Sequence, residues 1–122
     1  MSRHRHKLIL IPAFLFAMFT FFKNLFAAPD QTALREALAN KAFLVDVRTP
    51  GEFSGGSVTG AVNIPLGELP KQLARFKGKK HIVVFCRSGN RSSSAKAILT
   101  QNGFTQVVDG GTWQQVQKAL EP

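Results

Sequence analysis

The feature that most restricts the fold of this chain is an uninterrupted apolar run, Ile-Val-Val-Phe at 82–85, which leads directly into Cys86. A strand that is apolar on both faces has to be covered on both faces, as in parallel sheets that lie between two layers of helices. The run therefore predicts a central, buried strand. In sheets of this kind, sites form beyond the carboxyl ends of the strands, which is where Cys86 lies.

The rest of the chain alternates strand and helix patterns. Further strands are predicted at 42–47, 61–64 and 104–108. Helices are predicted at 30–40 and 92–102, a broken or short helix at 66–76, and a turn at 109–111. Strands that alternate with helices at this spacing indicate an α/β fold, with a small parallel sheet flanked by helices on both faces.

Two more helices are predicted by capping boxes. Thr49 is followed three residues later by Glu52, and Thr112 by Gln115. In such a box the threonine side chain accepts a hydrogen bond from a first-turn amide, and the later side chain reaches back to the threonine amide. Pro50 suits the first helical position, because its missing N–H has no partner there.

The first 28 residues differ from the rest. Three basic residues within the first seven precede an uncharged apolar run at 8–22, and the segment ends in Ala27 and Ala28. This order is typical of a secretory signal peptide that is cleaved after either alanine. The alternative is an uncleaved membrane anchor over 8–28, whose one lysine snorkels. Both predict residues 29–122 as a single domain in the periplasm of a bacterium, either free or anchored to the inner membrane.

Composition excludes several classes of function. The chain has 16 Lys and Arg against 7 Asp and Glu, and without the first 28 residues the balance is 12 against 7, a net charge of +5. This mildly basic domain lacks the interleaved aromatic residues of nucleic-acid-binding surfaces, so no nucleic-acid partner is expected. One cysteine excludes an internal disulfide framework and zinc sites with several cysteines. The sequence contains no nucleotide, flavin or metal motif, and no cofactor is expected.

Cys86 opens a glycine-containing loop, Cys-Arg-Ser-Gly-Asn-Arg at 86–91, which precedes a helix start near Ser92. A thiol reacts as its thiolate, and a free pKa of ~8.5 leaves little thiolate at neutral pH. Successive loop amides and the positive end of a helix can stabilise that anion. Arg87 and Arg91 add positive charge. The pattern predicts a sulfur nucleophile in an anion cradle, against the alternative of an unreactive buried cysteine.

Four segments follow one another in an order typical of one family. They are Leu-Val-Asp-Val-Arg-Thr-Pro-Gly-Glu-Phe at 44–53, Gly-x-Val-x-Gly-Ala-Val-Asn-Ile-Pro at 56–65, Ile-Val-Val-Phe-Cys-Arg-Ser-Gly-Asn-Arg-Ser at 82–92, and a Gly-Phe, Gly-Gly and Trp pattern from 103. With these segments the chain resembles the rhodanese-homology family in its single-domain, exported form, from about Thr32 to Leu120. The resemblance implies a rhodanese-like α/β fold and sulfurtransferase activity.

In the chemistry that this resemblance implies, Cys86 takes a sulfane sulfur from a small anionic donor such as thiosulfate. It holds the sulfur as a persulfide and passes it to a nucleophilic acceptor, cyanide or a thiol. The amides of 87–91 would stabilise the anions, and Arg87 and Arg91 would attract the donor. Three residues would shape the loop: Ser88, Gly89 and Asn90. A reactive thiol in an oxidising compartment is expected either to carry sulfur already or to need a reducing thiol partner.

Asp46 and Arg48 match the family's Asp-x-Arg at the end of the first strand. They are expected to brace the loop and to add to its electrostatic field. The alternative for this pair is a surface salt bridge worth about 0–1 kcal/mol.

Other functions remain open. Four residues separate Cys86 from Arg91, whereas phosphatases and arsenate reductases of the Cys-x5-Arg kind have five, which disfavours oxyanion chemistry. A non-catalytic persulfide carrier that docks a partner would need the same cradle. A Cys–His hydrolase is poorly supported, because His81 lies about 16 Å away at the other end of the same strand.

Overall fold

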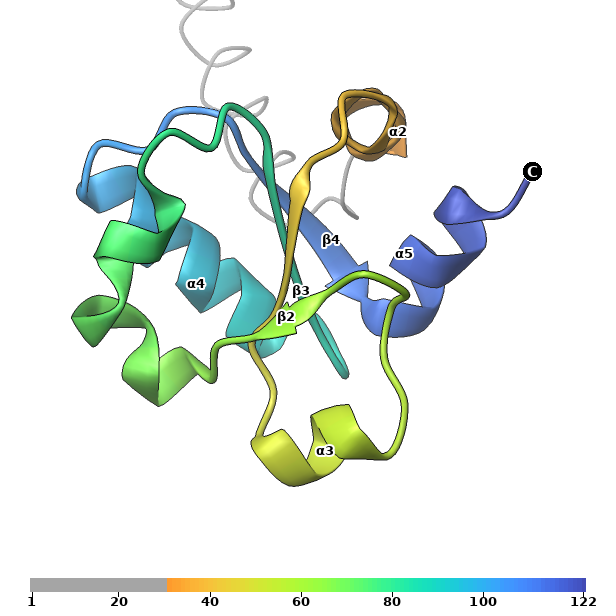
Figure 1. The fold of residues 1–122 in the computed structure, drawn as a ribbon, viewed down its shortest axis with the longest axis horizontal. Helices are drawn as coiled ribbons and strands as arrows, with labels where there is room; N and C mark the ends of the chain where they lie inside the picture. Colours follow the sequence, from red (N-terminus) through yellow and green to blue (C-terminus); the bar gives the residue numbers. More distant parts are fainter. Residues whose placement is uncertain (1–30) are drawn as a thin grey trace, which may run out of the picture.

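In a computed structural model of the protein, which describes residues 31–122, parallel strands form one sheet with helices on both faces (Figure 1). The strands are β1 (Phe43–Asp46), β2 (Val62–Asn63), β3 (Ile82–Cys86) and β4 (Val107–Thr112), in the order β2-β1-β3-β4. The helices are α2 (Gln31–Ala39), α3 (Pro50–Ser54), α4 (Asn90–Gln101) and α5 (Trp113–Leu120), together with two 3-10 helices, η1 (Leu66–Lys71) and η2 (Leu73–Phe76). This architecture confirms the predicted α/β fold.

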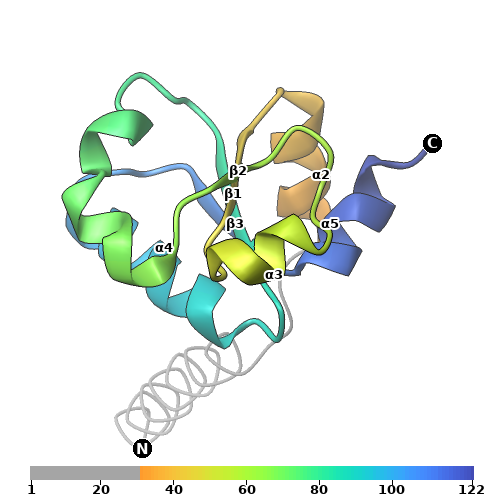
Figure 2. The same ribbon diagram turned by 60° about the horizontal axis from the view of Figure 1, so that its bottom comes forward.

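The two faces of the sheet are covered by different helices. α4, η1 and η2 pack on one face, and α2 and α5 pack on the other (Figure 2). β3 is buried along its whole length, as its apolar run predicts. Its alternate side chains enter the two layers: Ile82, Val84 and Cys86 lie in the cluster with α4, and Val83 and Phe85 in the cluster with α2 and α5. The Cys86 side chain therefore belongs to the α4 side.

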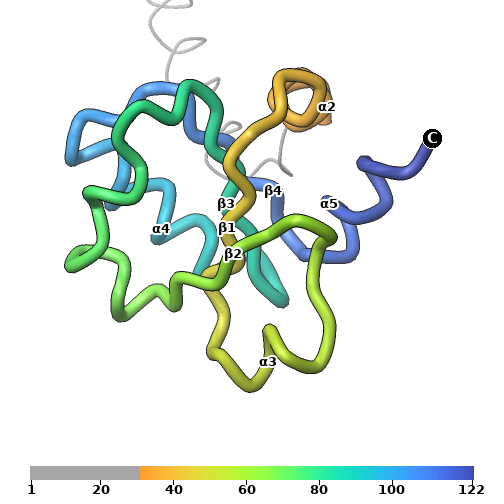
Figure 3. The backbone as a smooth tube through the Cα atoms, viewed as in Figure 1, coloured from red at the N-terminus to blue at the C-terminus, as the bar shows by residue number. Residues whose placement is uncertain are grey.

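The connections that follow β1 and β3 lead in opposite directions across the sheet. From β1 it runs through α3 to β2 on one side, and from β3 it runs through α4 to β4 on the other (Figure 3). Asp46 pairs with Phe85, so the carboxyl ends of β1 and β3 meet at one edge of the sheet. At such a switch point the two connections diverge and leave room for a site.

The turn predicted at 109–111 is wrong, because these residues belong to β4. The register of β4 against β3 shifts here, as in a bulge. A Cβ on Gly110 would lie 2.6 Å from Val116 Cγ2 and 3.1 Å from Val83 Cγ1. An Asp-Gly-Gly sequence is typical of turns, but in this strand the missing side chain at Gly110 lets α5 pack closely against β4.

The other elements lie near their predicted positions, except that β4 begins at Val107 rather than at residue 104. Both predicted capping boxes are formed, with Thr49 Oγ1 accepting from the Glu52 amide and Thr112 Oγ1 from the Gln115 amide, each at 3.2 Å. The helix predicted at 66–76 as broken or short is broken, since it forms two 3-10 helices. Pro70 lies inside the first of them and removes a backbone donor.

The predicted signal or anchor segment at 1–28 lies outside the described residues. Across residues 31–122, no helix is long and apolar enough to cross a membrane.

Replacing Gly110 by alanine is expected to lower the free energy of unfolding by about 1–3 kcal/mol, because the added methyl group overpacks a filled contact. Gly67→Ala is the matched control, since nothing lies within 4 Å of a Cβ at that position. Urea unfolding of both variants measures the difference. An equal change in the two variants would show that the contact between β4 and α5 has room for a side chain.

Candidate active site

Cys86 is the last residue of β3, is fully buried, and lies where the carboxyl ends of β1 and β3 meet. Only residues 87–89 separate it from α4, which begins at Asn90, two residues before the predicted start near Ser92. The loop is therefore short, and the positive end of a 12-residue helix lies next to the sulfur.

The sulfur of Cys86 takes the place of a helix cap. Gly89 occupies the N-cap position of α4 and has no side chain that could accept from the first-turn amides. Instead, Cys86 Sγ accepts from the Gly89 amide at 3.0 Å and from the Ser92 amide at 3.4 Å. Gly89 has a φ of 95°, a left-handed conformation that glycine adopts without strain. Glycine at this position thus lets two backbone donors meet on one sulfur.

From the sequence, Ser92 is expected only to mark the start of a helix, but in the structure it is part of the site. Its side chain is fully buried, and Cys86 Sγ donates to Ser92 Oγ at 3.5 Å. The Ser92 hydroxyl donates in turn to the Gly89 carbonyl at 3.0 Å. Because a hydroxyl rotates, it can donate to the sulfur once the thiol has lost its proton. Its position in the first turn of the helix after the cysteine was the available signal.

Opposing effects act on the ionisation of Cys86. Burial raises the pKa of the thiol, because a buried thiolate loses its hydration. Hydrogen bonds from the Ser92 hydroxyl, and from the amides of Ser92, Gly89 and Ser88, lower it. The hydrogen bonds prevail, so the pKa of Cys86 lies below its ordinary value. The geometry favours the thiolate that a sulfur nucleophile requires.

The other side chains at the mouth of the loop are exposed: Arg87, Ser88 and Asn90. Within residues 31–122, Arg87 forms neither an ion pair nor a side-chain hydrogen bond. Its charge is therefore available to an anion that approaches the loop.

Arg91 has an acidic partner, Glu52, that the sequence pattern did not reveal. The guanidinium donates to both carboxylate oxygens of Glu52, from Nη1 to Oε1 at 2.7 Å and from Nη2 to Oε2 at 3.0 Å. The Arg91 hydrogen bond, followed by that of the Thr49 amide, lowers the pKa of Glu52 to about 2. This pairing differs from the expectation that both arginines of the loop present free positive charge.

Asp46 and Arg48 form a buried ion pair, so the surface salt bridge considered as an alternative is wrong. Arg48 Nη2 lies 2.7 Å from Asp46 Oδ2, and Arg48 Nε donates to both carboxylate oxygens at 2.9 and 3.0 Å. Asp46 is fully buried, and Arg48 is only 5% exposed. Removing one partner of a buried pair costs about 3–5 kcal/mol, because the other charge is left uncompensated.

The same pair holds the segment that follows β1. Ser57 Oγ donates to Asp46 Oδ2 at 2.7 Å, and Arg48 Nη2 donates to the Gly56 carbonyl at 2.6 Å. Trp113 lies against the guanidinium, with its ring centroid 5.4 Å from Arg48 Cζ. The chain that follows α3 is thus tied back to the end of β1.

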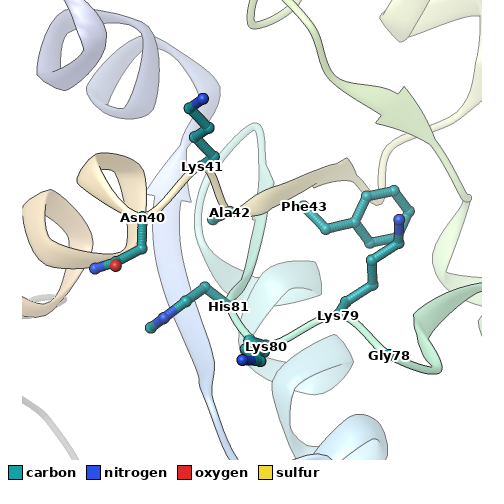
Figure 4. Close-up of a pocket in the computed structure, with 8 residues that line it drawn as sticks. All are labelled: Asn40, Lys41, Ala42, Phe43, Gly78, Lys79, Lys80 and His81. Carbon is teal, nitrogen blue, oxygen red and sulfur yellow. The ribbon is translucent and has the colours of Figure 1, made fainter.

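Two pockets lie at the other edge of the sheet, where β3 begins. The larger, of about 440 Å³, is lined by Asn40, Lys41, Ala42, Phe43, Gly78, Lys79, Lys80 and His81 (Figure 4). Its basic side chains do not converge, because Lys41 points away from Lys79, whose Nζ lies 4.9 Å from the centroid of the Phe43 ring. The smaller, of about 290 Å³, shares His81. Neither pocket includes Cys86, and among the described residues no cluster of His, Cys, Asp or Glu could hold a metal ion.

Comparison with known proteins agrees with this geometry. A model of the rhodanese-like domain family matches residues 30–117. The chain belongs to this family. Thiosulfate sulfurtransferase GlpE of Pseudomonas aeruginosa is 35% identical over 96 residues, which cover 75% of this chain and 86% of that protein. Thiosulfate sulfurtransferase PspE of Escherichia coli is 38% identical over 69 residues, covering 55% of this chain and 66% of that protein. The chain spans about half (53%) of the length of YqhL, an uncharacterized protein of Bacillus subtilis that is 40% identical over 67 residues.

Solved structures show that the sheet is that of the rhodanese fold. A rhodanese of Escherichia coli, solved with anions, has a TM-score of 0.56 and 34% identity, covering 61% of this chain and 89% of that one. A rhodanese-related protein of Thermoplasma volcanium has a TM-score of 0.60 and 31% identity, covering 75% of this chain and 95% of that one. The Cys86 loop thus lies at the carboxyl edge of a rhodanese domain.

Ser92→Ala is expected to raise the pKa of Cys86, because it removes the hydroxyl that supports the thiolate. The pH dependence of thiolate absorbance, or of alkylation by iodoacetamide, measures this pKa. Ser93→Ala is the matched control, since Ser93 is the next residue of α4 and is exposed. An unchanged pKa in Ser92→Ala would show that the backbone amides alone stabilise the anion.

Proposed function

We propose that this rhodanese domain is a sulfurtransferase that moves a sulfane sulfur from a small anionic donor, thiosulfate above all, to cyanide or a thiol. The observation that carries the proposal is the environment of Cys86 Sγ, which accepts from two backbone amides at the start of α4 and has a lowered pKa. The names of relatives that are 34% to 38% identical, all sulfurtransferases, support the same chemistry.

The reaction proceeds in two displacements. The Cys86 thiolate attacks the outer sulfur of thiosulfate, a new S–S bond forms at Cys86, and sulfite leaves with the electrons of the broken S–S bond. The acceptor then attacks the terminal sulfur of the Cys86 persulfide, and the thiolate leaves with the electron pair. With cyanide the product is thiocyanate. Each step exchanges one anionic nucleophile for another, so no external oxidant, reductant or proton is required.

The parts of the loop have different roles in these steps. We assign the amides of Gly89 and Ser92 to stabilisation of the thiolate and the persulfide anion, because both already donate to the sulfur. We assign Arg87 to attraction of the donor, because it is exposed and carries an uncompensated charge among residues 31–122. Ser88 and Asn90 border the approach to the sulfur and would adjust the choice of donor.

Purified protein is expected to turn over thiosulfate and cyanide to thiocyanate, and Cys86→Ser is expected to reduce the rate to the uncatalysed level. Incubation with thiosulfate alone should add the mass of one sulfur atom to the wild type and none to the variant. Ser93→Ala, an exposed change in the same helix, is expected to keep the wild-type rate.

Other outcomes would overturn this assignment in distinct ways. A folded wild type that accepts sulfur on Cys86 but releases it only to a protein partner would be a persulfide carrier rather than an enzyme. Hydrolysis of a phosphate ester faster than turnover of thiosulfate would indicate oxyanion chemistry.

We also propose that residues 1–28 direct export to the periplasm of a bacterium, where the domain is either free after cleavage or anchored to the inner membrane. The support is the order of a basic start, the apolar run at 8–22, and Ala27 and Ala28. Cell fractionation with mass measurement is expected to find a chain that starts at residue 28 or 29 in the periplasm, or the full chain in the membrane. Full-length protein in the cytosol would contradict both. In an oxidising compartment the thiol would either carry sulfur already or need a reducing thiol partner.

A further inference from the structure

We propose that Glu52 sets the charge at the Cys86 loop by holding Arg91 in an ion pair, so that Arg87 rather than Arg91 meets an anionic donor. This inference rests on the proposed sulfurtransferase function for the identity of the donor. It makes Glu52 a positioning residue that determines how strongly the site prefers doubly charged donors.

The geometry shows that the two side chains act as one unit. Two nitrogens of Arg91 donate to two oxygens of Glu52, at 2.7 and 3.0 Å, which is the paired arrangement that guanidinium and carboxylate prefer. Such pairing occupies two of the five N–H donors of Arg91, and the carboxylate offsets the positive charge of the guanidinium. The electrostatic attraction of Arg91 for thiosulfate is therefore weak while the pair lasts.

Glu52 is held in place independently of Arg91. Its Oε1 also accepts from the Thr49 amide and from Thr49 Oγ1, both at 3.1 Å, as part of the capping box of α3. The segment that follows α3 is tied to the buried pair of Asp46 and Arg48 through Gly56 and Ser57. The Glu52 carboxylate is thus fixed opposite the first turn of α4, where it pairs with Arg91.

The charges around the sulfur add up to less than the sequence indicates. Arg91 is neutralised by Glu52 and Arg48 by Asp46, which leaves Arg87 as the uncompensated cation of the loop within residues 31–122. Both partners also carry their charges around neutral pH, because the pKa of Glu52 is lowered to about 2 and that of Arg91 is raised, in each case first by the hydrogen bond between them. The loop therefore presents one free positive charge rather than two.

The ion pair of Glu52 and Arg91 affects the charge of the Cys86 loop more than the stability of the fold. Its side chains remain 33% and 27% exposed, and exposed ion pairs contribute little to the stability of a fold. Glutamine at position 52 keeps an oxygen that can accept from Thr49, so Glu52→Gln removes the charge and retains the cap. The charge can therefore be changed without loss of the fold.

The test compares Glu52→Gln, Arg91→Gln and the double variant, with Glu36→Gln as the matched control. Glu36 lies on α2 and lines a pocket at the opposite edge of the sheet, so its removal changes net charge but not the loop. The readout is the ratio of Cys86 alkylation rates with iodoacetate and iodoacetamide. One reagent is an anion and the other is neutral, so the ratio reports the electrostatic potential at the sulfur.

The ratio is expected to rise by about two- to fivefold in Glu52→Gln, which exposes the charge of Arg91. It is expected to fall by a similar factor in Arg91→Gln, which leaves Glu52 uncompensated, and to return to the wild-type value in the double variant. Glu36→Gln should leave it unchanged. The KM for thiosulfate should follow the inverse order, lowest in Glu52→Gln and near wild type in the double variant.

Two results would overturn the proposal. If Arg91 binds anions directly, the double variant will keep the low ratio and the high KM of Arg91→Gln. If the pair does not neutralise Arg91, the ratio in Glu52→Gln will equal that of the wild type. Alkylation needs only the thiol, so it tests the pair even if thiosulfate is not turned over, and failure of the sulfurtransferase assignment remains separate.

Discussion

The active edge of this sheet depends on one buried ion pair. Asp46 is fully buried at the end of β1, where a carboxylate without partners would be costly. It accepts from the Arg48 amide, from the Arg48 guanidinium and from the Ser57 hydroxyl. Asn63 of β2 adds hydrogen bonds to the carbonyls of Asp46 and Arg48, both at 2.9 Å. In the described part of the chain no buried side-chain N or O atom lacks a partner, so this network holds the segment after β1 in one arrangement.

That arrangement reaches the sulfur through a second ion pair. α3 lies between β1 and the two residues tied back to its end, Gly56 and Ser57. The capping box of α3 orients Glu52, and Glu52 holds Arg91 in the first turn of α4. The same turn directs the amide and the hydroxyl of Ser92 at Cys86. The connections that diverge from β1 and β3 are thus joined again by side chains. These side-chain contacts fix the geometry of a site made mainly of backbone amides, and they fix the charge around its sulfur.

Much of the fold could be predicted because its signals are local. The apolar run at 82–85 forms a strand that is buried throughout, and both threonine capping boxes start helices where the sequence predicts them. The failure at 109–111 has a spatial cause. Glycine is needed at position 110 because the side chains of Val83 and Val116 pack against the backbone of β4 there. The Asp-Gly-Gly pattern that predicts a turn includes neither valine.

The site, like the fold, has some features that depend on neighbours along the chain and others that depend on neighbours in space. The sequence by itself determined that Cys86 ends a buried strand and opens a glycine-containing loop before a helix, because strand, turn and helix preferences depend on neighbours along the chain. Only the tertiary structure decided that Arg91 is paired with Glu52, 39 positions away, and that Asp46 is buried with Ser57, 11 positions away. The physical reason is the parallel pairing of β1 with β3, which brings their carboxyl ends together. Burial and ion pairing depend on neighbours in space, and these exist only once the sheet has formed.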